Sequence, residues 1–290
     1  KSESNYAAIK ISGVAIGYGK RLLWPDDYFN VATDLSYQYY QLNNYSDAFS
    51  YSDGYSNNIS ATVSLARNSV DAPIFPRSGS EVSLIFQFTP PYSYFNNKDY
   101  KTLTNQEKYK WLEYHKWKFN AFLYTKLANK LVLNTRTRFG FLGLFNRDLG
   151  ITPFERFYLG GDGLSGFALD DRELIGLRGY SNNSVTPRGN SGYIGGTIFN
   201  KYTMELRYLI SPNPMATVYI LGFIEAGNTW LKFSEYNPFD VKRSFGLGIR
   251  IYLPMFGLLG LDYGYGIDKI PNMPTANKGQ FHFSINQSID

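Results

Sequence analysis

Hydrophobic and polar residues alternate with a period of two in one segment after another along the chain. In segment 131–141, Leu131, Leu133 and Phe139 fall on one face, while Asn134 and Arg136 fall on the other. This alternation is typical of a β-strand with one apolar and one polar face. It predicts eleven strands, at approximately 6–19, 29–42, 58–67, 80–89, 115–127, 131–144, 201–210, 216–228, 242–253, 257–267 and 279–289.

The lengths of the predicted strands and connections are those of a membrane barrel. Many strands have about ten residues, the length that a tilted strand needs to cross a bilayer, whereas strands in soluble proteins average five or six. Short connections at 20–28, 68–79, 128–130, 211–215 and 254–256 alternate with mostly longer, polar ones at 43–57, 90–114, 145–200, 229–241 and 268–278. We therefore predict an all-β fold, a transmembrane antiparallel β-barrel that contacts the lipid bilayer of a bacterial outer membrane.

A soluble β-sandwich or a lipocalin-like barrel is the alternative, because its strands also alternate. Composition favours the membrane barrel. Aromatic residues make up 18% of the chain, and they cluster at strand ends, where membrane barrels carry aromatic girdles. Charged residues also make up 18%, against about 25% in an ordinary soluble domain. No window reaches 18 consecutive apolar residues, which disfavours a transmembrane helix.

The chain offers little for catalysis, metal binding or nucleic-acid binding. It has no cysteine, and its two histidines, His115 and His282, are too few for a His-based metal site. Neither histidine has a convincing nucleophile beside it, so we expect no enzymatic activity. The net charge is +5, but the basic residues are scattered, which argues against nucleic-acid binding. No cofactor and no metal are predicted.

The predicted strand count is odd. Bacterial single-chain barrels have an even number of strands, and an open sheet edge facing hydrocarbon leaves backbone groups unsatisfied. We therefore expect the chain, residues 1–290, to be the C-terminal part of a longer barrel whose upstream strands are absent.

The 145–200 connection is the longest, and loops of this length with little structure of their own are generally functional. It contains the segment Phe157-Tyr158-Leu159-Gly160-Gly161 and, further on, Leu177-Arg178-Gly179-Tyr180. A dinucleotide- or phosphate-binding loop is a poor interpretation of these glycines, because no βαβ pattern surrounds them.

These residues resemble the Omp85 superfamily, and within it the outer-membrane protein assembly factors. In that family the sixth extracellular loop carries an FYxGG segment and then a (V/I)RG(F/Y) motif, folds back into the barrel lumen and presses its arginine against acidic residues of the wall. Here Phe157, Tyr158, Gly160 and Gly161 match the first element, and Leu177–Tyr180 match the second. The segment 164–167 occupies the usual place of the motif but has no arginine, so we assign the role to Arg178.

The resemblance extends to a turn and to two strands. Asn68, Asp71, Phe75 and Gly79 fit the family's periplasmic turn pattern N-x-x-D-x-x-x-F-P-x-x-G. The segments 204–206 and 223–230 resemble the strands that supply the acidic partners of the loop arginine.

The acidic residues of those two strands are Glu205 and Glu225. Glu205 shares a polar face with Thr203 and Arg207, whereas hydrophobic residues lie on both faces around Glu225. Our hypothesis is that Arg178 docks the loop by pairing with Glu225 and Glu205, and that Gly179 lets the backbone approach the wall. The alternative is a solvated loop arginine.

The last predicted strand, 279–289, resembles the family's closing strand. Phe281, Phe283 and Ile285 share one face, and His282 is expected on the other as a polar residue of the lumen or interface rather than as a ligand.

The resemblance implies a 16-stranded barrel with POTRA repeats upstream, which are absent here. It also implies a function, the folding and insertion of outer-membrane proteins through a lateral seam between the first and last strands. The implied partners are unfolded outer-membrane proteins and accessory assembly lipoproteins or outer-membrane subunits. The alternatives are a secretion or translocation pore for one dedicated partner and a passive porin-like transporter.

Overall fold

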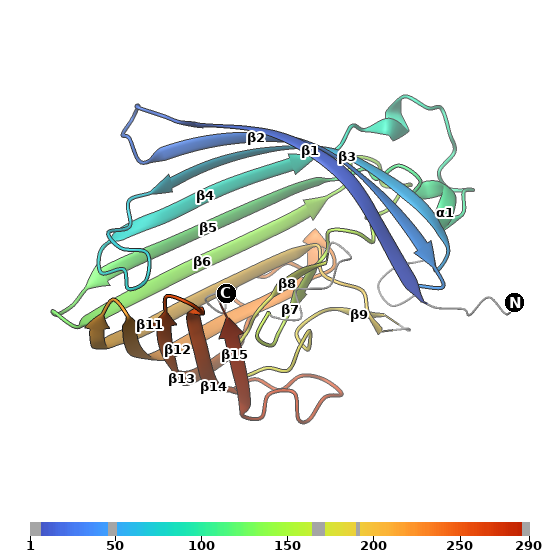
Figure 1. Cartoon of the computed structure of the whole chain (residues 1–290). Helices are drawn as coiled ribbons and strands as arrows, with labels where there is room; N and C mark the ends of the chain where they lie inside the picture. Colours follow the sequence, from blue (N-terminus) through green and yellow to red (C-terminus); the bar gives the residue numbers. More distant parts are fainter. Residues whose placement is uncertain (1–6, 46–50, 164–171, 190–191, 286–290) are drawn as a thin grey trace, which may run out of the picture.

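The computed structural model describes residues 7–45, 51–163, 172–189 and 192–285, and its main feature is one antiparallel sheet of eleven strands (Figure 1). Strands that follow one another in the chain are neighbours in the sheet, except that β11 pairs with β6 across four short strands of the long loop. The sheet strands are β1 (Ala8–Arg21), β2 (Phe29–Asn43), β3 (Gly54–Asn68), β4 (Gly79–Phe88), β5 (His115–Lys126), β6 (Leu131–Gly143), β11 (Ile198–Asn213), β12 (Ala216–Trp230), β13 (Lys242–Leu253), β14 (Gly257–Gly266) and β15 (Gln280–Ile285).

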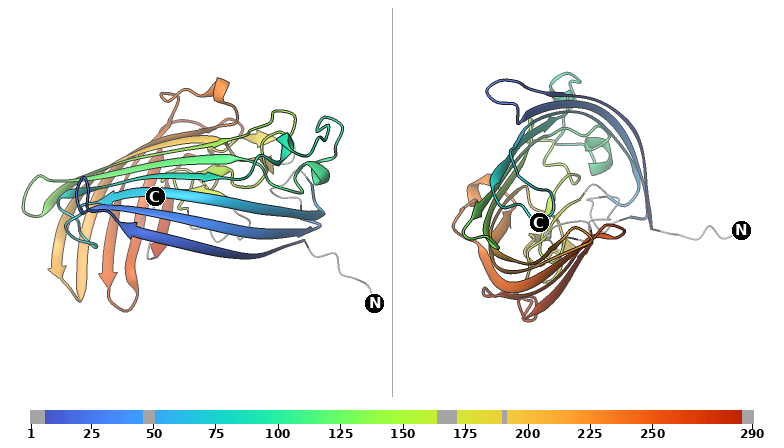
Figure 2. Two further views of the ribbon diagram at one scale, coloured as in Figure 1. Left: turned by 90° about the horizontal axis from the view of Figure 1, so that it is seen from above. Right: turned by 60° about the vertical axis from the view of Figure 1, so that its left-hand side comes forward.

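The sheet curls around the long loop, so that one face is concave and the other is convex (Figure 2). Along β11, Glu205 points inward and is 1% exposed, while its neighbours Met204 and Leu206 point outward and are 50% and 45% exposed. Apolar side chains thus cover the outside and polar ones the inside, the reverse of a soluble β-sandwich. This confirms the two faces predicted from the alternation. In the described part of the chain, no helix combines the length and the apolar character needed to span a membrane.

The connections differ in length at the two ends of the sheet, as the sequence predicts. One end has the short connections 22–28, 69–78, 127–130, 214–215 and 254–256. The other end has the longer connections 44–53, 89–114, 144–197, 231–241 and 267–279. Connection 89–114 carries a 3-10 helix, Tyr92–Tyr94, and the short helix α1 (Asn105–Lys108), which begins with a capping box between Thr104 and Glu107.

Two strands begin three or four residues earlier than predicted, because polar side chains at their ends hide the alternation. β3 begins at Gly54 instead of 58, and Ser56 and Asn57 are buried there. β11 begins at Ile198 instead of 201, and Asn200, which interrupts its apolar stripe, is buried and donates from Nδ2 to the carbonyl oxygen of Pro238 at 3.2 Å. β15 is described over Gln280–Ile285, and residues 286–289 of the predicted closing strand lie outside the described residues.

The long loop contains short strands that the alternation could not reveal, because two or three residues carry no recognisable period. β7 (Phe157–Leu159) pairs in parallel with β8 (Glu173–Ile175). β9 (Arg188–Gly189) pairs with β10 (Gly192–Tyr193) in an antiparallel hairpin. All four belong to the loop rather than to the large sheet.

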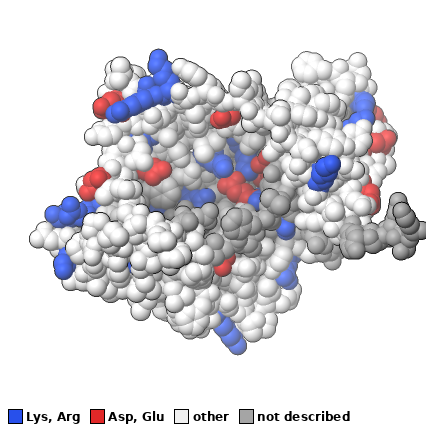
Figure 3. Space-filling model, viewed as in Figure 1, with Lys and Arg blue, Asp and Glu red and all other residues white. Residues whose placement is uncertain are grey.

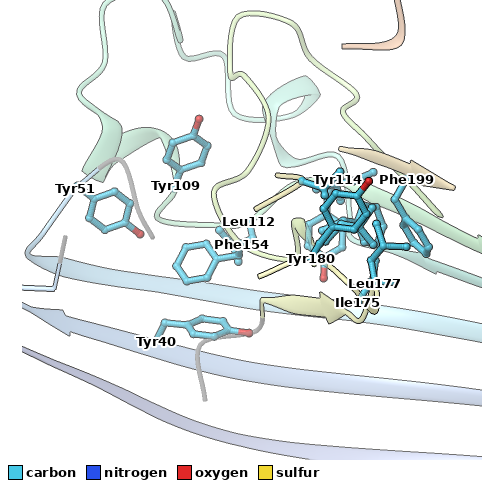
Figure 4. Packing of buried hydrophobic residues seen from close by; sticks show 14 of the residues in the cluster. Tyr40, Tyr51, Tyr109, Leu112, Tyr114, Phe154, Ile175, Leu177, Tyr180 and Phe199 are labelled. Carbon is cyan, nitrogen blue, oxygen red and sulfur yellow. The ribbon is translucent and has the colours of Figure 1, made fainter. Parts of the chain in front are cut away.

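The main hydrophobic core lies inside the concave face, between the sheet and the loop (Figure 4). Loop residues Phe157, Ile175 and Leu177 pack there with Phe199 of β11 and with Tyr114, which precedes β5. Gly140 of β6 makes room for this packing, since a Cβ atom there would lie 2.3 Å from Cε1 of Phe199. The core therefore forms only when the loop enters the curve of the sheet.

The β3–β4 turn has the local structure that its pattern of residues requires. Oδ1 of Asp71 accepts hydrogen bonds from the backbone N–H groups of Arg77 (2.8 Å) and Ser78 (3.2 Å). Gly79 has φ +104°, and a Cβ atom there would lie 2.2 Å from the carbonyl oxygen of Ser69. Phe75 leaves the turn and packs edge-on against Tyr219 of β12, with ring centroids 5.1 Å apart.

We expect Asp71→Ala to lower the free energy of unfolding of the full-length protein by about 1 kcal/mol, the value of a modest hydrogen bond. The loss is small because the Asp71 carboxylate is exposed and solvent weakens its interactions. Partial burial raises the pKa of Asp71, but the backbone hydrogen bonds outweigh burial and hold it below the ordinary 3.8. The carboxylate's stabilisation is therefore present above pH 3.8 and lost as the pH falls through the lowered pKa. Urea titrations in vesicles measure the difference in unfolding free energy between wild type and variant, once above pH 3.8 and once below the lowered pKa.

Asp71→Asn, which keeps Oδ1 as an acceptor, serves as the control. Equal losses of stability in Asp71→Ala and Asp71→Asn would contradict this account.

Candidate functional site

Arg178 is fully buried against the concave face, between β11, β12 and β14. Its Nη2 donates to Oε1 of Glu225 and to Oε1 of Glu205, both at 2.7 Å, and its Nε donates to Oε1 of Glu225 at 3.1 Å. Its backbone N–H donates to Oε2 of Glu225 at 2.8 Å. Nη1 lies 3.5 Å from Oδ1 of Asp262. The structure therefore brings Arg178 against both predicted carboxylates and a third.

Each of these carboxylates has a second cationic partner on the wall. Glu205 accepts from Nη2 of Arg136 at 3.1 Å and from Nη2 of Arg207 at 2.6 Å. Glu225 lies 3.2 Å from Nζ of Lys201. These charged side chains lie on the concave face and are almost entirely buried. Figure 3 shows that basic and acidic side chains also gather where the hollow of the molecule is open to view. We call Arg178, Glu205, Glu225, Asp262, Arg136, Arg207, Lys201 and Arg250 the ionic network.

Asp262 of β14 and Arg250 of β13 form a two-point ion pair, with Nη1–Oδ1 and Nη2–Oδ2 at 2.9 and 2.8 Å. A carboxylate held in this way by a guanidinium fork keeps a fixed orientation. Asp262 therefore presents Oδ1 toward Arg178 from a rigid position.

Arg178 also stacks on an aromatic ring. Its guanidinium carbon lies 3.7 Å from the ring centroid of Phe223, close enough for a cation–π contact. Phe223 points inward together with Tyr219, Leu221 and Glu225. The inner face of β12 is apolar because Phe75 and Arg178 cover it, which is why the face of Glu225 is ambiguous in the sequence.

Gly179 and the glycines of β14 bring the loop and the wall into backbone contact. Gly179 has φ +87°, and a Cβ atom there would lie 2.8 Å from the carbonyl carbon of Tyr265. A Cβ atom on Gly264 would lie 2.6 Å from the backbone nitrogen of Gly179. The backbone N–H of Gly179 donates to Nε2 of His282 in β15 at 2.9 Å. His282 thus faces the concave side, in contact with the loop.

Tyr180 fastens the motif to the neighbouring connection. Its hydroxyl donates to the carbonyl oxygen of Arg243 at 2.8 Å and accepts from the backbone N–H of Asp268 at 3.1 Å. Burial, reinforced by the nearby Asp268 carboxylate, raises the pKa of Tyr180 to about 12. Hydrogen bonds from Arg243 hold the pKa of Asp268 below its ordinary value. Both groups therefore keep one charge state across the physiological range.

The FYLGG segment lies beneath the Leu177–Tyr180 motif. Phe157 packs on Phe199 with ring centroids 4.7 Å apart, and Tyr158 is buried. Gly160 has φ +128°, and a Cβ atom there would lie 2.6 Å from the carbonyl oxygen of Ser181. The carbonyl oxygen of Gly161 accepts from the N–H of Leu177 at 2.9 Å. The two segments are thus stacked on one another.

The remaining sequence-predicted residues lie elsewhere. Phe281, Phe283 and Ile285 of β15 point outward, away from the ionic network, and are 75%, 47% and 48% exposed. The segment 164–167, which lacks the arginine, lies outside the described residues.

Sequence reasoning missed the other five members of the network, which are Asp262, Arg250, Arg136, Arg207 and Lys201. All five lie on strands that the sequence predicts, but which strand residues oppose one another depends on the register. Among the described residues, no group of three or more His, Cys, Asp or Glu side chains is arranged to hold a metal ion. The arrangement can hold the loop on the wall, and each of the three carboxylates of the network has at least two cationic partners.

The comparisons with known proteins agree on the fold. A family model described as the Omp85 superfamily domain matches residues 1–289. The chain is similar to the crystal structure of BamA from Haemophilus ducreyi lacking POTRA domains 1–3, with 17% identity, TM-score 0.66, and coverage of 96% of this chain and 54% of that chain. It is also similar to CdiB from Escherichia coli, with 13% identity, TM-score 0.56, and coverage of 96% and 45%. No curated protein sequence matches it significantly. At these identities the likeness concerns the fold alone, and the chain spans about half the length of both structures.

We expect Arg178→Glu to release the loop, because a buried ion pair that loses one partner costs about 3–5 kcal/mol. Chymotrypsin cleaves after aromatic residues, so its sites are unaffected by the substitution. It should cleave the 144–197 connection of the full-length variant much faster than that of the wild type. Arg178→Lys keeps the charge without the fork and should lie between the two. Unchanged cleavage in Arg178→Glu would favour a solvated arginine.

We expect Gly179→Ala to undock the motif as well, since its Cβ would meet the backbone of Tyr265 and Gly266 within 2.8–2.9 Å. Gly192 in the same loop is the matched control. It also has a positive φ, +136°, but a Cβ atom there would have no neighbour within 4 Å. Gly192→Ala should therefore cost only the backbone strain, about 1 kcal/mol. Similar chymotrypsin sensitivity of the two variants would contradict the close-approach account.

Proposed function

Because the chain belongs to the Omp85 superfamily of bacterial outer-membrane β-barrels, we propose that it forms the barrel of an assembly factor that folds and inserts outer-membrane proteins. The superfamily is not enzymatic, so the activity requires no catalytic side chain. The work falls instead to the backbone at the seam between the first and last strands of the barrel. The proposed substrates are unfolded outer-membrane proteins, and the proposed partners are accessory assembly lipoproteins or outer-membrane subunits.

The physical basis of the proposal is β-strand addition. An edge strand presents unpaired N–H and C=O groups that template a new strand. Pairing at the edge lowers the cost of bringing polar backbone into hydrocarbon, where each unsatisfied group costs several kcal/mol. β15 supports this role, because it stands at one end of the described sheet and pairs with β14 along one edge. Its outward residues Phe281, Phe283 and Ile285 are apolar and suit a lipid environment.

The observation that carries the proposal is the loop held against the concave face. A polypeptide that passed through the space occupied by the loop would have to displace Arg178 from Glu205 and Glu225. Leaving buried carboxylates without this partner costs about 3–5 kcal/mol. A strand that enters at the seam leaves these contacts in place. The docked loop therefore favours insertion at an edge over passage through the lumen.

Secretion of one dedicated partner is the second candidate, and the fold likeness to CdiB supports it. The two candidates differ in the range of proteins affected. Depletion of the full-length protein should lower many outer-membrane proteins if it is an assembly factor. Loss of a single secreted protein, with the others unchanged, would favour secretion. High and steady conductance across a planar bilayer would instead favour a passive porin-like transporter.

The seam can be tested directly by crosslinking, because this chain has no cysteine of its own. We expect a disulfide between a cysteine at Phe283 and one placed opposite it on the first strand of the full-length barrel to abolish assembly. Reduction should restore it. Assembly of a model barrel protein into vesicles is the measurement.

The matched control is a disulfide between cysteines at Leu247 and Tyr263, which are register partners inside the sheet on β13 and β14. This crosslink should leave assembly intact. Full activity with the seam crosslinked would exclude the lateral route.

A further inference from the structure

A second group of buried charges joins the same loop to β5, with the polarity reversed. Nζ of Lys116, which points inward from β5 and is 3% exposed, lies 2.8 Å from Oε2 of Glu155 and 2.8 Å from Oε2 of Glu173. It also sits 4.9 Å from the ring centroid of Phe157. Here the wall supplies the cation and the loop supplies the carboxylates. We call Lys116, Glu155 and Glu173 the β5 anchor.

The loop side of the β5 anchor is held in a strained backbone conformation. Glu155 has φ +65°, which is uncommon for a residue other than glycine and persists only where surrounding contacts enforce it. Both of its carboxylate oxygens are used, Oε2 by Lys116 and Oε1 by the hydroxyl of Tyr114 at 3.1 Å. That hydroxyl in turn accepts from Gln87 of β4 at 2.9 Å and from Asn58 of β3 at 3.2 Å. The anchor therefore reaches three neighbouring strands.

A short, hydrogen-bonded path connects the β5 anchor to Arg178. Glu173 begins β8, which pairs along its full length with β7, and Phe157 opposite Glu173 belongs to the main core. Two residues after β8, the N–H of Leu177 bonds the carbonyl oxygen of Gly161, and Arg178 follows. In Figure 1 the β7–β8 pair lies within the curve of the sheet. The carboxylate that binds β5 and the guanidinium that binds β11, β12 and β14 thus stand five residues apart.

We propose that Lys116 is a positioning residue that makes the loop a strut, tied at one end to β5 and at the other to β14 and β15. The β14–β15 end consists of Arg178 against the ionic network, Gly179 on Gly264, and the hydrogen bond from Gly179 to His282. Because the strut crosses β6, β11, β12 and β13, its length fixes the curvature of that part of the sheet. Release of Lys116 loosens the contact of Gly179 with His282, and with it the hold on β15. The consequence for insertion rests on the proposed function, whereas the strut itself does not.

The test compares local protection at the two ends of the loop. In Lys116→Met, the apolar chain keeps the contact with Phe157, but Glu155 and Glu173 lose their shared cation. Hydrogen exchange of the full-length protein in vesicles should accelerate in peptides that contain Gly179 and β15 by about fivefold or more, the lower end of typical couplings between sites. Lys116→Arg, whose fork can bind both carboxylates, should restore protection.

Lys118→Met is the matched control. Lys118 also points inward from β5, but it is more exposed, and its Nζ lies 3.4 Å from Oε2 of Glu173. Its loss should leave exchange at Gly179 and β15 near the wild-type rate. The triple variant Lys116→Met, Glu155→Gln, Glu173→Gln removes the anchor without leaving buried charges unpaired. It should still accelerate exchange at the far end, which separates loss of the tether from charge repulsion.

Acceleration confined to peptides around Glu155 and Glu173 in Lys116→Met, with Gly179 and β15 as protected as in wild type, would overturn the strut. A global loss of protection in Lys116→Met and in Lys118→Met alike would overturn it too, because it would mean general destabilisation. Exchange at Gly179 and β15 can respond as expected while depletion of the full-length protein affects only one exported protein. That combination would support the strut and exclude the assembly function. The two inferences thus fail by different measurements.

Discussion

The structure depends on the burial of a charge that cannot be neutralised. A carboxylate or an amine can change its protonation state when it leaves water, whereas the guanidinium of Arg178 stays charged, so its surroundings must provide the opposite charge. Glu205, Glu225 and Asp262 do so from three strands. Those carboxylates are themselves buried and need cations of their own, so the requirement spreads along the wall to the rest of the ionic network.

The membrane environment explains why all of this polarity is internal. The convex face meets hydrocarbon and carries Met204, Leu206 and their apolar equivalents on other strands. Polar side chains remain on the concave face, where they can be satisfied by one another and by the loop. The loop consequently acts as the protein's core, with its apolar residues in the main cluster and its charges matched to the wall.

Sequence patterns predicted the sheet well, because alternation with period two is the direct consequence of strands that have lipid on one side. They predicted the strand ends less well, since the polar residues Ser56 and Asn57 extend β3 ahead of its predicted start at 58. For the site, the polar residues Thr203 and Arg207 on the same side of the strand predicted that Glu205 faces inward. Glu225 was ambiguous because Phe223 and Tyr219 share its inner face. Asp262, Arg250 and the β5 anchor required the register between strands and the path of the loop, neither of which local patterns contain.

The glycines of β14 give this strand an unusual dependence on the rest of the chain. At Gly264 and Gly266 the strand has no inward side chains, and the backbone of Gly179 and the ring of Tyr180 fill that space. The inner surface of β14 is therefore completed by Gly179 and Tyr180, which stand more than 80 positions earlier in the sequence. A sheet that forms before the loop arrives would have an open trough along β14. The order of events in the protein's own folding is thereby constrained, since the last strands can be hydrogen-bonded early but become packed only when the loop arrives.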